Sequence, residues 1–273
     1  MKVEQAKQIA SNAIEQLRQA LEAGQSERLK DYLAAIARFR RYSWGNVMLI
    51  ASQKPNATHV AGFHAWHKLG RFVKKGEKGI LILAPIIRKK AESVGATERD
   101  ESSVAVGFRA AYVFDITQTD GQPLPEIGSV NGDPREYHER LAKFVAEQRI
   151  ALEYSEEIAP ARGTSSGGKI TLLPGQSSAE EFATLAHEVA HEMMHRDERR
   201  SSTTKRVRET EAEAVAFVVC SAIGLETGSA AQDYIGLYGG DANLLSESLE
   251  YVQRTATQIL NAIGADESSA SPV

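Results

Sequence analysis

The residues most able to do chemistry lie in the segment TLAHEVAHEMMH, residues 184–195. His187 and His191 are four residues apart, so on a helix both imidazoles project from one face, about one turn apart. Such a pair can bind one metal ion, and the carboxylate of Glu188 lies beside it, where it can accept a proton from a metal-bound water. The flanking residues are apolar, and burying these groups without partners is costly, so the segment predicts a metal site with a catalytic base.

A third ligand has to come from another part of the chain. His195 lies eight residues from His187, about 12 Å of helix rise, with no glycine between them to break the helix. We therefore expect His195 to be structural, at the C-terminal end of the helix. The better source is a second predicted helix, RETEAEAVAFVV, which carries Glu209, Glu211 and Glu213. Glu209 and Glu213 share a helix face with small alanines. Glu211 points away from that face and is the alternative ligand.

At this point the sequence resembles zinc peptidases whose second helix carries Glu-x-x-x-Asp or Glu-x-x-Ala-Asn. The resemblance implies that Glu209 is the third ligand and that Glu213 supports a histidine from behind, although this chain has Glu where the pattern often has Asp or Asn. Two histidines, one carboxylate and an open position are typical of catalytic Zn²⁺, and Mn²⁺ or another divalent metal suits the same donors. By analogy, the segment GGKITLL before the helix is expected to be an edge strand that pairs with an extended peptide.

Charge and composition predict a globular protein of two modules. The 273 residues are 42% hydrophobic and 25% charged. Residues 1–90 hold 17 Lys and Arg against 6 Asp and Glu, a net charge of +11, so the remainder carries −15 of the overall −4. A basic module attracts polyanions, of which nucleic acid is the usual one, and a merely solubilising surface is the alternative. A single cysteine, Cys220, and the lack of a signal peptide or membrane-length apolar run predict a cytoplasmic protein without a membrane partner.

Hydrophobic periodicity predicts an α+β fold with a boundary at a Pro- and Gly-rich segment. We expect a mixed α/β domain at 1–120, a linker at 121–134, a second domain at 135–265 and a disordered tail at 266–273. The longer helices are expected at 3–23, 26–40, 134–149, 177–195, 206–223 and 242–263, with a short one near 229–236. The segment RFVKKGEKGILILAP predicts two strands joined by a Gly-Glu-Lys-Gly turn.

Aromatic residues stand among basic ones in the first 90 residues. Aromatic rings can stack on unpaired bases while Lys and Arg follow the phosphates, which predicts a surface for single-stranded DNA. Phe63 and Phe72 are expected in the core instead. The predicted nucleic-acid contacts are Arg40, Arg41, Tyr42, Trp44, Asn46, Trp66, Arg71, Lys74, Lys75 and Lys78.

The segment from YSWGN to KKGEKGILILAP, residues 42–85, resembles the N-terminal domain of ArdC-type antirestriction proteins. The resemblance rests on Tyr-Ser-x-x-Asn, Gln-x-Pro-x-Ala-Thr, a tryptophan followed by Leu-Gly-Arg, and the Val-Lys-Lys-Gly-Glu-Lys-Gly-Ile turn. In that family this domain implies binding of single-stranded DNA. A zincin-like metallopeptidase domain with an HExxH helix and a Glu helix follows it, in the order seen here.

Three functions are consistent with these features. The leading hypothesis is a single-stranded DNA-binding protein with a zinc-dependent metallopeptidase domain, a hydrolase of mobile elements that acts in DNA transfer or antirestriction. The alternative is a regulatory metalloprotease, because the second domain also resembles ImmA/IrrE peptidases, which cleave protein partners such as repressors. The third is a binding protein whose metal site is only structural.

Overall fold

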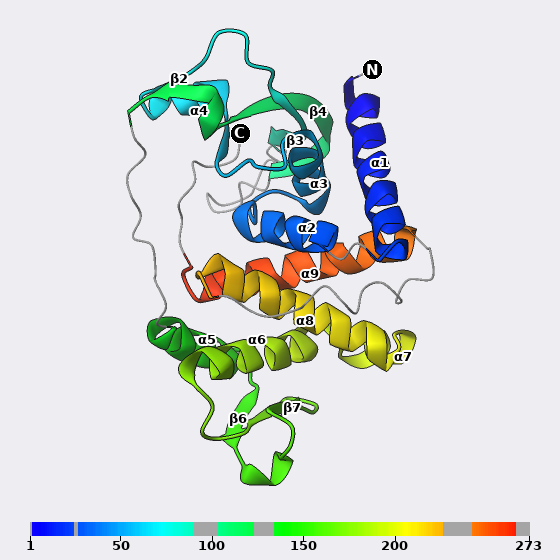
Figure 1. Cartoon of the computed structure of the whole chain (residues 1–273), viewed down its shortest axis with the longest axis vertical. Coiled ribbons are helices and arrows are strands. Elements are labelled where there is room, and N and C mark those ends of the chain that lie inside the picture. Colours follow the sequence, from blue (N-terminus) through cyan, green and yellow to red (C-terminus); the bar gives the residue numbers. More distant parts are fainter. Residues whose placement is uncertain (1, 25–26, 90–102, 123–133, 226–241, 266–273) are drawn as a thin grey trace, which may run out of the picture. The chain divides into compact units, whose positions relative to one another are not determined.

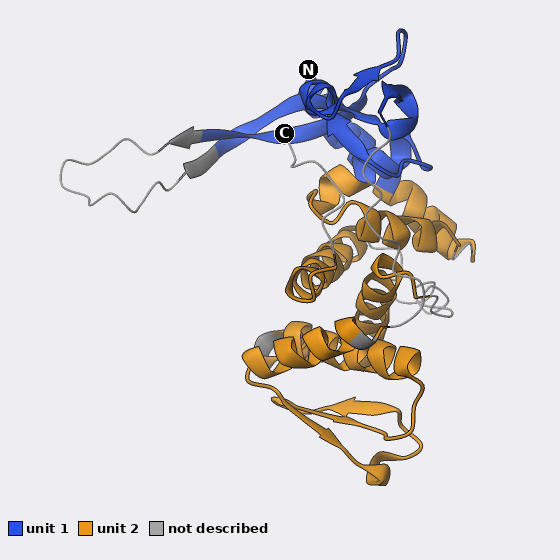
Figure 2. Ribbon diagram, turned by 90° about the vertical axis from the view of Figure 1, so that its left-hand side faces the viewer, with its two compact units in different colours: residues 1–13, 48–124, 269–273 blue, residues 14–47, 125–268 orange. Residues whose placement is uncertain are grey.

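The computed structural model describes residues 2–24, 27–89, 103–122, 134–225 and 242–265. These residues form helices and several small sheets, so the predicted α+β class is confirmed (Figure 1). They divide into two compact units, coloured separately in Figure 2. The helix expected near 229–236, most of the linker at 121–134 and the tail at 266–273 lie outside the described residues.

The first unit contains residues 1–13 and 48–124 and is built on a long hairpin. Strand β3 (Ile80–Lys89) pairs antiparallel with β4 (Ser103–Asp115), and the short β1 (Val60–Gly62) pairs with the other edge of β4. Helices α1 (Lys2–Glu22) and α3 (Trp44–Gln53) pack apolar side chains against this hairpin. Ala6 of α1 and Leu49 of α3 form a buried cluster with Leu81 of β3.

The lysine-rich loop at 74–79 connects two strands of different sheets. Strand β2 (Arg71–Val73) follows helix α4 (Phe63–Lys68) and pairs with β5 (Thr119–Gly121), not with β3 as a hairpin across the Gly-Glu-Lys-Gly turn would require. The loop is held from within by Gln118, at the end of the 3-10 helix η1 (Ile116–Gln118). The side-chain amide of Gln118 donates to Glu77 Oε2 at 2.8 Å and to the carbonyl of Lys78 at 2.9 Å.

The second unit contains residues 14–47 and 125–268. Its helices in the described part of the chain are α2 (Glu27–Arg38), α5 (Arg135–Glu147), α6 (Ser178–Met194), α7 (Asp197–Ser202), α8 (Lys205–Ala222) and α9 (Ala242–Ala262). Helix α8 lies at the centre and contacts α2, α6 and α9. The buried face of α2 therefore packs within this second unit, with residues that lie much later in the sequence. None of the described helices is both long and apolar enough to span a membrane.

Helix α6 begins with the local signal that the sequence carries. Ser177 is the N-cap, its hydroxyl accepts from the Glu180 backbone N–H, and the Glu180 side chain accepts from the Ser177 backbone in return. The apolar stripe of the helix is buried, including Phe182, Leu185 and Val189. On α8, Ala212 and Ala216 are also buried, and such small side chains allow close packing of the two helices.

A three-stranded sheet lies beside α6 (Figure 1). Strand β8 (Lys169–Leu172) is its central strand, parallel to β6 (Ala151–Tyr154) on one side and antiparallel to β7 (Gly163–Ser165) on the other. The expectation that residues 167–173 form an edge strand is therefore wrong, because β7 occupies that edge. Sequence reasoning missed β7 because its three residues, Gly-Thr-Ser, carry no strand pattern.

Candidate metal centre

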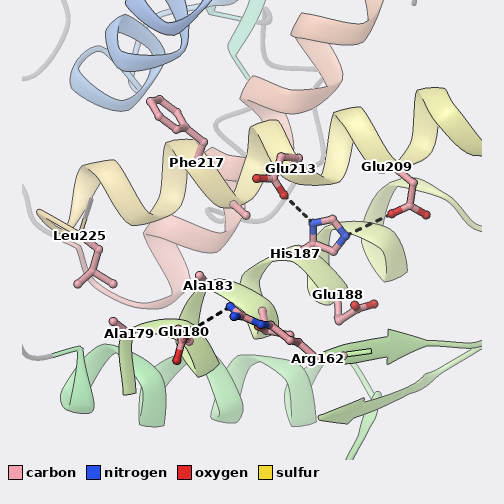
Figure 3. A pocket seen from close by; sticks show the side chains of 13 residues that line it. Arg162, Ala179, Glu180, Ala183, His187, Glu188, Glu209, Glu213, Phe217 and Leu225 are labelled. Carbon is pink, nitrogen blue, oxygen red and sulfur yellow. Dashed lines mark ion pairs between the residues drawn. The ribbon is translucent and has the colours of Figure 1, made fainter. Parts of the chain in front are cut away.

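Helices α6 and α8 bring three candidate ligands together, two of which, His187 and Glu209, are labelled in Figure 3. His187 and His191 come from α6 and Glu209 from the facing side of α8, and one potential ligand atom of each lies within 4.8 Å of the others. The two imidazole Nε2 atoms are 3.1 Å apart. The Glu209 Oε2 atom is 3.6 Å from Nε2 of His187 and 3.5 Å from Nε2 of His191.

This triangle fits the donor geometry of a divalent metal ion. Bonds of about 2.0–2.1 Å to a tetrahedral metal place neighbouring ligand atoms about 3.3–3.4 Å apart. The observed separations of 3.1, 3.5 and 3.6 Å lie around that value. Two imidazole nitrogens and one carboxylate oxygen are also the donor types of a catalytic site rather than of a closed structural one. The residues present therefore suit a metal ion without rearrangement of the helices.

The candidate base lies in the same cleft. A cleft of about 510 Å³ is lined by His187, Glu188, Glu209 and Glu213 together with the alanine-rich face of α6. The Glu188 side chain is buried, with 6% of its surface exposed, on the side of α6 that faces β7. Arg162 lies at the cleft, and its guanidinium is 3.1 Å from the carboxylate of Glu180 (Figure 3).

Strand β7 passes very close to the base. A Cβ atom added to Gly163 would lie 2.6 Å from Cγ2 of Thr184 and 3.0 Å from both Cγ and Oε1 of Glu188. Only a residue without a side chain lets the strand backbone approach the helix at this distance. Neither Gly163 nor Arg162 was identified from the sequence, since nothing local places them opposite a helix that starts fifteen residues later.

The electrostatics of the cleft favour positive charge at His187. Burial on its own would lower the pKa of this imidazole, but Glu209, Glu213 and the charge of Glu188 raise it to about 9. In return, the neighbouring imidazoles of His187 and His191 hold the pKa of Glu209 well below its usual range, although burial opposes the shift. The cleft thus concentrates negative charge around the imidazole nitrogens, as a cation site does.

The other two glutamates of α8 point in different directions. Glu213 Oε2 is 3.4 Å from Nδ1 of His187, behind the ring, which is the position expected of a supporting residue. Glu211 is fully buried and lies 2.9 Å from His195, which in turn lies 3.0 Å from His191. His195 is the C-cap residue of α6 and is not part of the ligand cluster.

The predicted nucleic-acid contacts divide between the two units and differ in exposure. Trp44 and Trp66 are 6% and 2% exposed, and the indole of Trp66 donates to the carbonyl of Phe114 at 2.8 Å. Arg71 is buried too, where its guanidinium bonds Thr119 and the carbonyl of Gln122. These three side chains bury their polar atoms inside the protein, and buried tryptophan rings offer no face to a base.

The remaining predicted contacts, with the exception of Asn46, are exposed or half-buried. Lys74, Lys75 and Lys78 are exposed on the loop of the first unit. In the second unit Arg41 is exposed, Arg40 and Tyr42 are half-buried, and Asn46 is buried. Burial raises the pKa of the Tyr42 hydroxyl to about 12.

Two phenylalanines differ from their predicted place in the core. Phe63 is 54% exposed and Phe72 is 56% exposed, so that prediction was wrong. Each ring packs edge-on against a histidine: Phe63 against His64 with centroids 5.8 Å apart, and Phe72 against His67 at 5.2 Å. Phe63 is the first residue of α4, and Phe72 lies in β2.

Comparison with known proteins agrees with the resemblance drawn from the sequence. Residues 4–114 match the family model of the N-terminal domain of anti-restriction factor ArdC. Two crystal structures of the antirestriction protein ArdC from plasmid R388 share the fold. The metal-free one has 23% identity and a TM-score of 0.52 over 83% of this chain and 86% of that one. The Mn(II)-bound one has 21% identity and a TM-score of 0.50 over 85% and 97%.

A curated relative extends the comparison to a longer protein. An uncharacterised protein of Bacillus anthracis is 26% identical in an alignment of 272 positions that covers 84% of this chain. The chain spans about half the length of that relative, 46% of it.

Proposed function

Since the chain is ArdC-like, with residues 4–114 matched by the ArdC N-terminal family, we propose that its second unit is a divalent-metal-dependent peptidase of zincin type. One observation carries the proposal. His187, His191 and Glu209 converge within 4.8 Å, and Glu188 lies next to them in an open cleft. A site of merely structural type would close around the metal with four protein ligands, and it would not need a base beside it.

Each residue has a separate task in this mechanism. His187, His191 and Glu209 hold the metal ion, and Glu213 orients the ring of His187 from its Nδ1 side. A bound divalent metal ion supplies acidity to a coordinated water and polarises a carbonyl. Glu188 is placed where its carboxylate could accept a proton from the attacking water and deliver it to the leaving amine, since a carboxylate can serve as base and then as acid.

Manganese and zinc are both candidates for the metal. The ArdC structure from plasmid R388 that carries a metal holds Mn(II), which supports a divalent ion here without selecting zinc. Two imidazoles and one carboxylate bind either ion, and affinity alone generally favours zinc over manganese. Titration of the metal-free protein with each ion would decide between them.

The position of β7 supports an extended peptide as substrate. Within the described sheet, β7 pairs with β8 on one side only, and the cleft lining includes both Gly163 of this strand and Glu188. An extended chain that adds to the free edge of β7 would run along α6, with its main-chain groups paired and one peptide bond near the ligand cluster. The protein substrate expected from the sequence would bind in this way.

The peptidase proposal is tested with Glu188→Gln. Metal-loaded protein is incubated with a mixed peptide library and products are identified by mass spectrometry. We expect Glu188→Gln to lose about 10²–10⁴-fold in cleavage rate while its metal dissociation constant stays unchanged, because the amide cannot accept a proton. Glu181→Gln is the matched control on the same helix, since Glu181 bonds Tyr154 and does not line the cleft. Equal cleavage by wild type and Glu188→Gln would refute the proposal.

A specific observation also favours a second function, binding of single-stranded DNA by the first unit. The exposed rings of Phe63 and Phe72 lie on α4 and β2, and the exposed lysines of the loop at 74–79 follow directly in the chain. Rings that face solvent can stack on unpaired bases while ammonium groups contact phosphates. Together with the ArdC relatives, this surface supports a role of the chain in antirestriction or DNA transfer.

Oligonucleotide titrations followed by fluorescence anisotropy test this second function. We expect tighter binding to a single strand than to a duplex, a loss of about 1–3 kcal/mol in Phe72→Ala, and a salt slope reduced by about one in Lys75→Ala. Phe108→Ala is the matched control, because Phe108 is a phenylalanine of the same unit and is 61% exposed. Binding that is indifferent to salt, or equally weakened by Phe108→Ala, would contradict the assignment of this surface.

A further inference from the structure

Behind the candidate ligand His191 runs a buried chain of polar side chains. Nδ1 of His191 is 3.0 Å from Nδ1 of His195. Nε2 of His195 is 2.9 Å from Oε2 of Glu211, and Oε1 of Glu211 accepts from Nη2 of Arg199 at 2.6 Å. The side chains of His195 and Glu211 are 0% and 1% exposed, so no bulk water competes for these bonds.

The chemistry of its last members gives this chain of bonds one direction. Glu211, as a carboxylate held by Arg199, can only accept, so His195 must carry a proton on Nε2. A neutral His195 then has a lone pair on Nδ1, and it accepts from an Nδ1–H of His191. The neutral His191 consequently has its free lone pair on Nε2, the atom that faces His187 and Glu209 in the ligand cluster.

Arg199 is the last residue of this series of hydrogen bonds, and helix α9 holds it in place. Its guanidinium lies 3.6 Å from the ring centroid of Tyr251, in helix α9, and 3.7 Å from the carboxylate of Glu247. The cation is thus held between α8 and α9. Glu211 turns Oε1 to Arg199 and Oε2 to His195, and Ser248 of α9 is a further side-chain hydrogen-bond partner of this carboxylate. We call the hydrogen-bonded series His191, His195, Glu211 and Arg199 the relay. Its donor-to-acceptor direction is therefore fixed by the packing of several helices and not by one mobile side chain.

We propose that His195, Glu211 and Arg199 are positioning residues that fix the metal-binding tautomer of His191. The proposal rests on the proposed metal site and adds to it a role for three residues that touch neither metal nor substrate. Donation from a ligating imidazole to a second group typically sets its orientation and basicity, and loss of that group weakens metal binding by about 10–100-fold. Here the second group is a histidine, and a buried ion pair stands behind it.

The two histidine ligands differ in how they are supported. His187 contacts Glu213, at 3.4 Å, but that carboxylate is 50% exposed and can be replaced by water. His191 contacts a partner that is closed off from solvent. Disturbing the relay at Glu211 should therefore weaken the metal site more than disturbing Glu213, although Glu213 is the nearer of the two to the cleft.

Glu211→Gln tests the direction of the relay with almost no change of shape. The amide oxygen of the glutamine must face Arg199, which only donates, so its NH₂ group faces His195. His195 would then accept at Nε2 and donate from Nδ1, and His191 would be left protonated on Nε2. We expect this reversal to appear as an exchange of the His191 tautomer in long-range ¹H–¹⁵N spectra of the metal-free protein.

Metal affinity is measured in parallel by competition with a chelator, with Mn²⁺ and Zn²⁺ as probes. We expect Glu211→Gln to weaken binding of both ions about 10–100-fold, and Glu213→Gln to have a smaller effect. Glu192→Gln is the matched control, because Glu192 is a buried carboxylate of α6 that bonds Gly168 and Arg196 outside the relay. It should leave both the tautomer and the affinity at their wild-type values.

The outcomes separate this inference from the proposed metal site. If wild type binds neither ion, the metal site is refuted, and the tautomer in the metal-free spectra still decides the direction of the relay. If wild type binds metal but Glu211→Gln keeps both the affinity and the His191 tautomer, the inference is overturned. A variant that loses only thermal stability, with an unchanged tautomer, would show that His195 and Glu211 serve folding alone and would also overturn it.

Discussion

Replacement of Gly163 by alanine should distort the candidate site through one steric contact. The new Cβ atom would meet Cγ2 of Thr184 at 2.6 Å, whereas carbon atoms pack at about 3.5–4.0 Å. Strand β7 and helix α6 must therefore separate by about 1 Å, or the side chains of Thr184 and Glu188 must rotate. Overpacking of this kind costs about 1–3 kcal/mol, which lowers the melting temperature by about 2–4 °C per kcal/mol in a unit of this size.

The same displacement should be visible in activity. Glu188 is in contact with the added atom, at 3.0 Å, and a misplacement of about 1 Å in a catalytic group can cost about 10²-fold in rate. Thr184→Ser removes the clashing methyl group and keeps the hydroxyl that bonds Gln176. We expect the double variant to be about 1–2 kcal/mol more stable than the sum of the two single substitutions predicts. The cleavage rate should recover less, because the contact with Glu188 remains.

A glycine outside the candidate site serves as the control. A Cβ atom added to Gly45, in α3, meets nothing within 4 Å, so Gly45→Ala should be neutral or stabilising by up to about 1 kcal/mol. Thermal melts and peptide-cleavage rates are compared for five proteins: wild type, Gly163→Ala, Thr184→Ser, the double variant and Gly45→Ala. If Gly163→Ala has the same melting temperature as Gly45→Ala and retains the wild-type cleavage rate, the close contact between β7 and α6 does not position Glu188, and the role assigned to that strand is refuted.

Three further predictions concern buried groups outside the cleft. Trp66→Phe leaves the carbonyl of Phe114 without its donor and should cost about 1–3 kcal/mol in denaturant titrations, yet leave the oligonucleotide affinity of the folded protein unchanged. Burial on its own would raise the pKa of Asp115, but hydrogen bonds from Thr117 and nearby backbone N–H groups hold this pKa below its usual value. Its stabilisation is present above the unfolded pKa and is lost as pH falls, so the stability gap between wild type and Asp115→Asn should shrink below about pH 4. Burial raises the pKa of the Cys220 thiol to about 12, and a thiol reagent at pH 8 should label it only after unfolding.

Local signals explain which elements could be predicted from the sequence. The capping pair Ser177 and Glu180 and the 3.6-residue periodicity lie within α6 itself, so both the helix and its start were predictable. The partner of α2 was not, because periodicity shows that a helix buries one face but not against which element. That partner, α8, begins about 170 residues further along the chain. For the same reason the exposed Phe72 and the buried Trp66 look alike in sequence, since each stands among lysines and glycines.

The three glutamates of α8 show where sequence reasoning about the site ended. Helix geometry puts Glu209 and Glu213 on one face and Glu211 on another, but it does not say which face meets α6. That choice depends on residues of two other helices. Arg199 bonds the carboxylate of Glu211, and the ring of Tyr251 packs against the guanidinium of Arg199. A carboxylate that is 1% exposed requires a partner at least as strictly as the half-buried histidines of α6 do. The rule that indicated a metal for His187 and His191 therefore also applies to Glu211, and the tertiary fold gives it a histidine and an arginine in place of a metal ion.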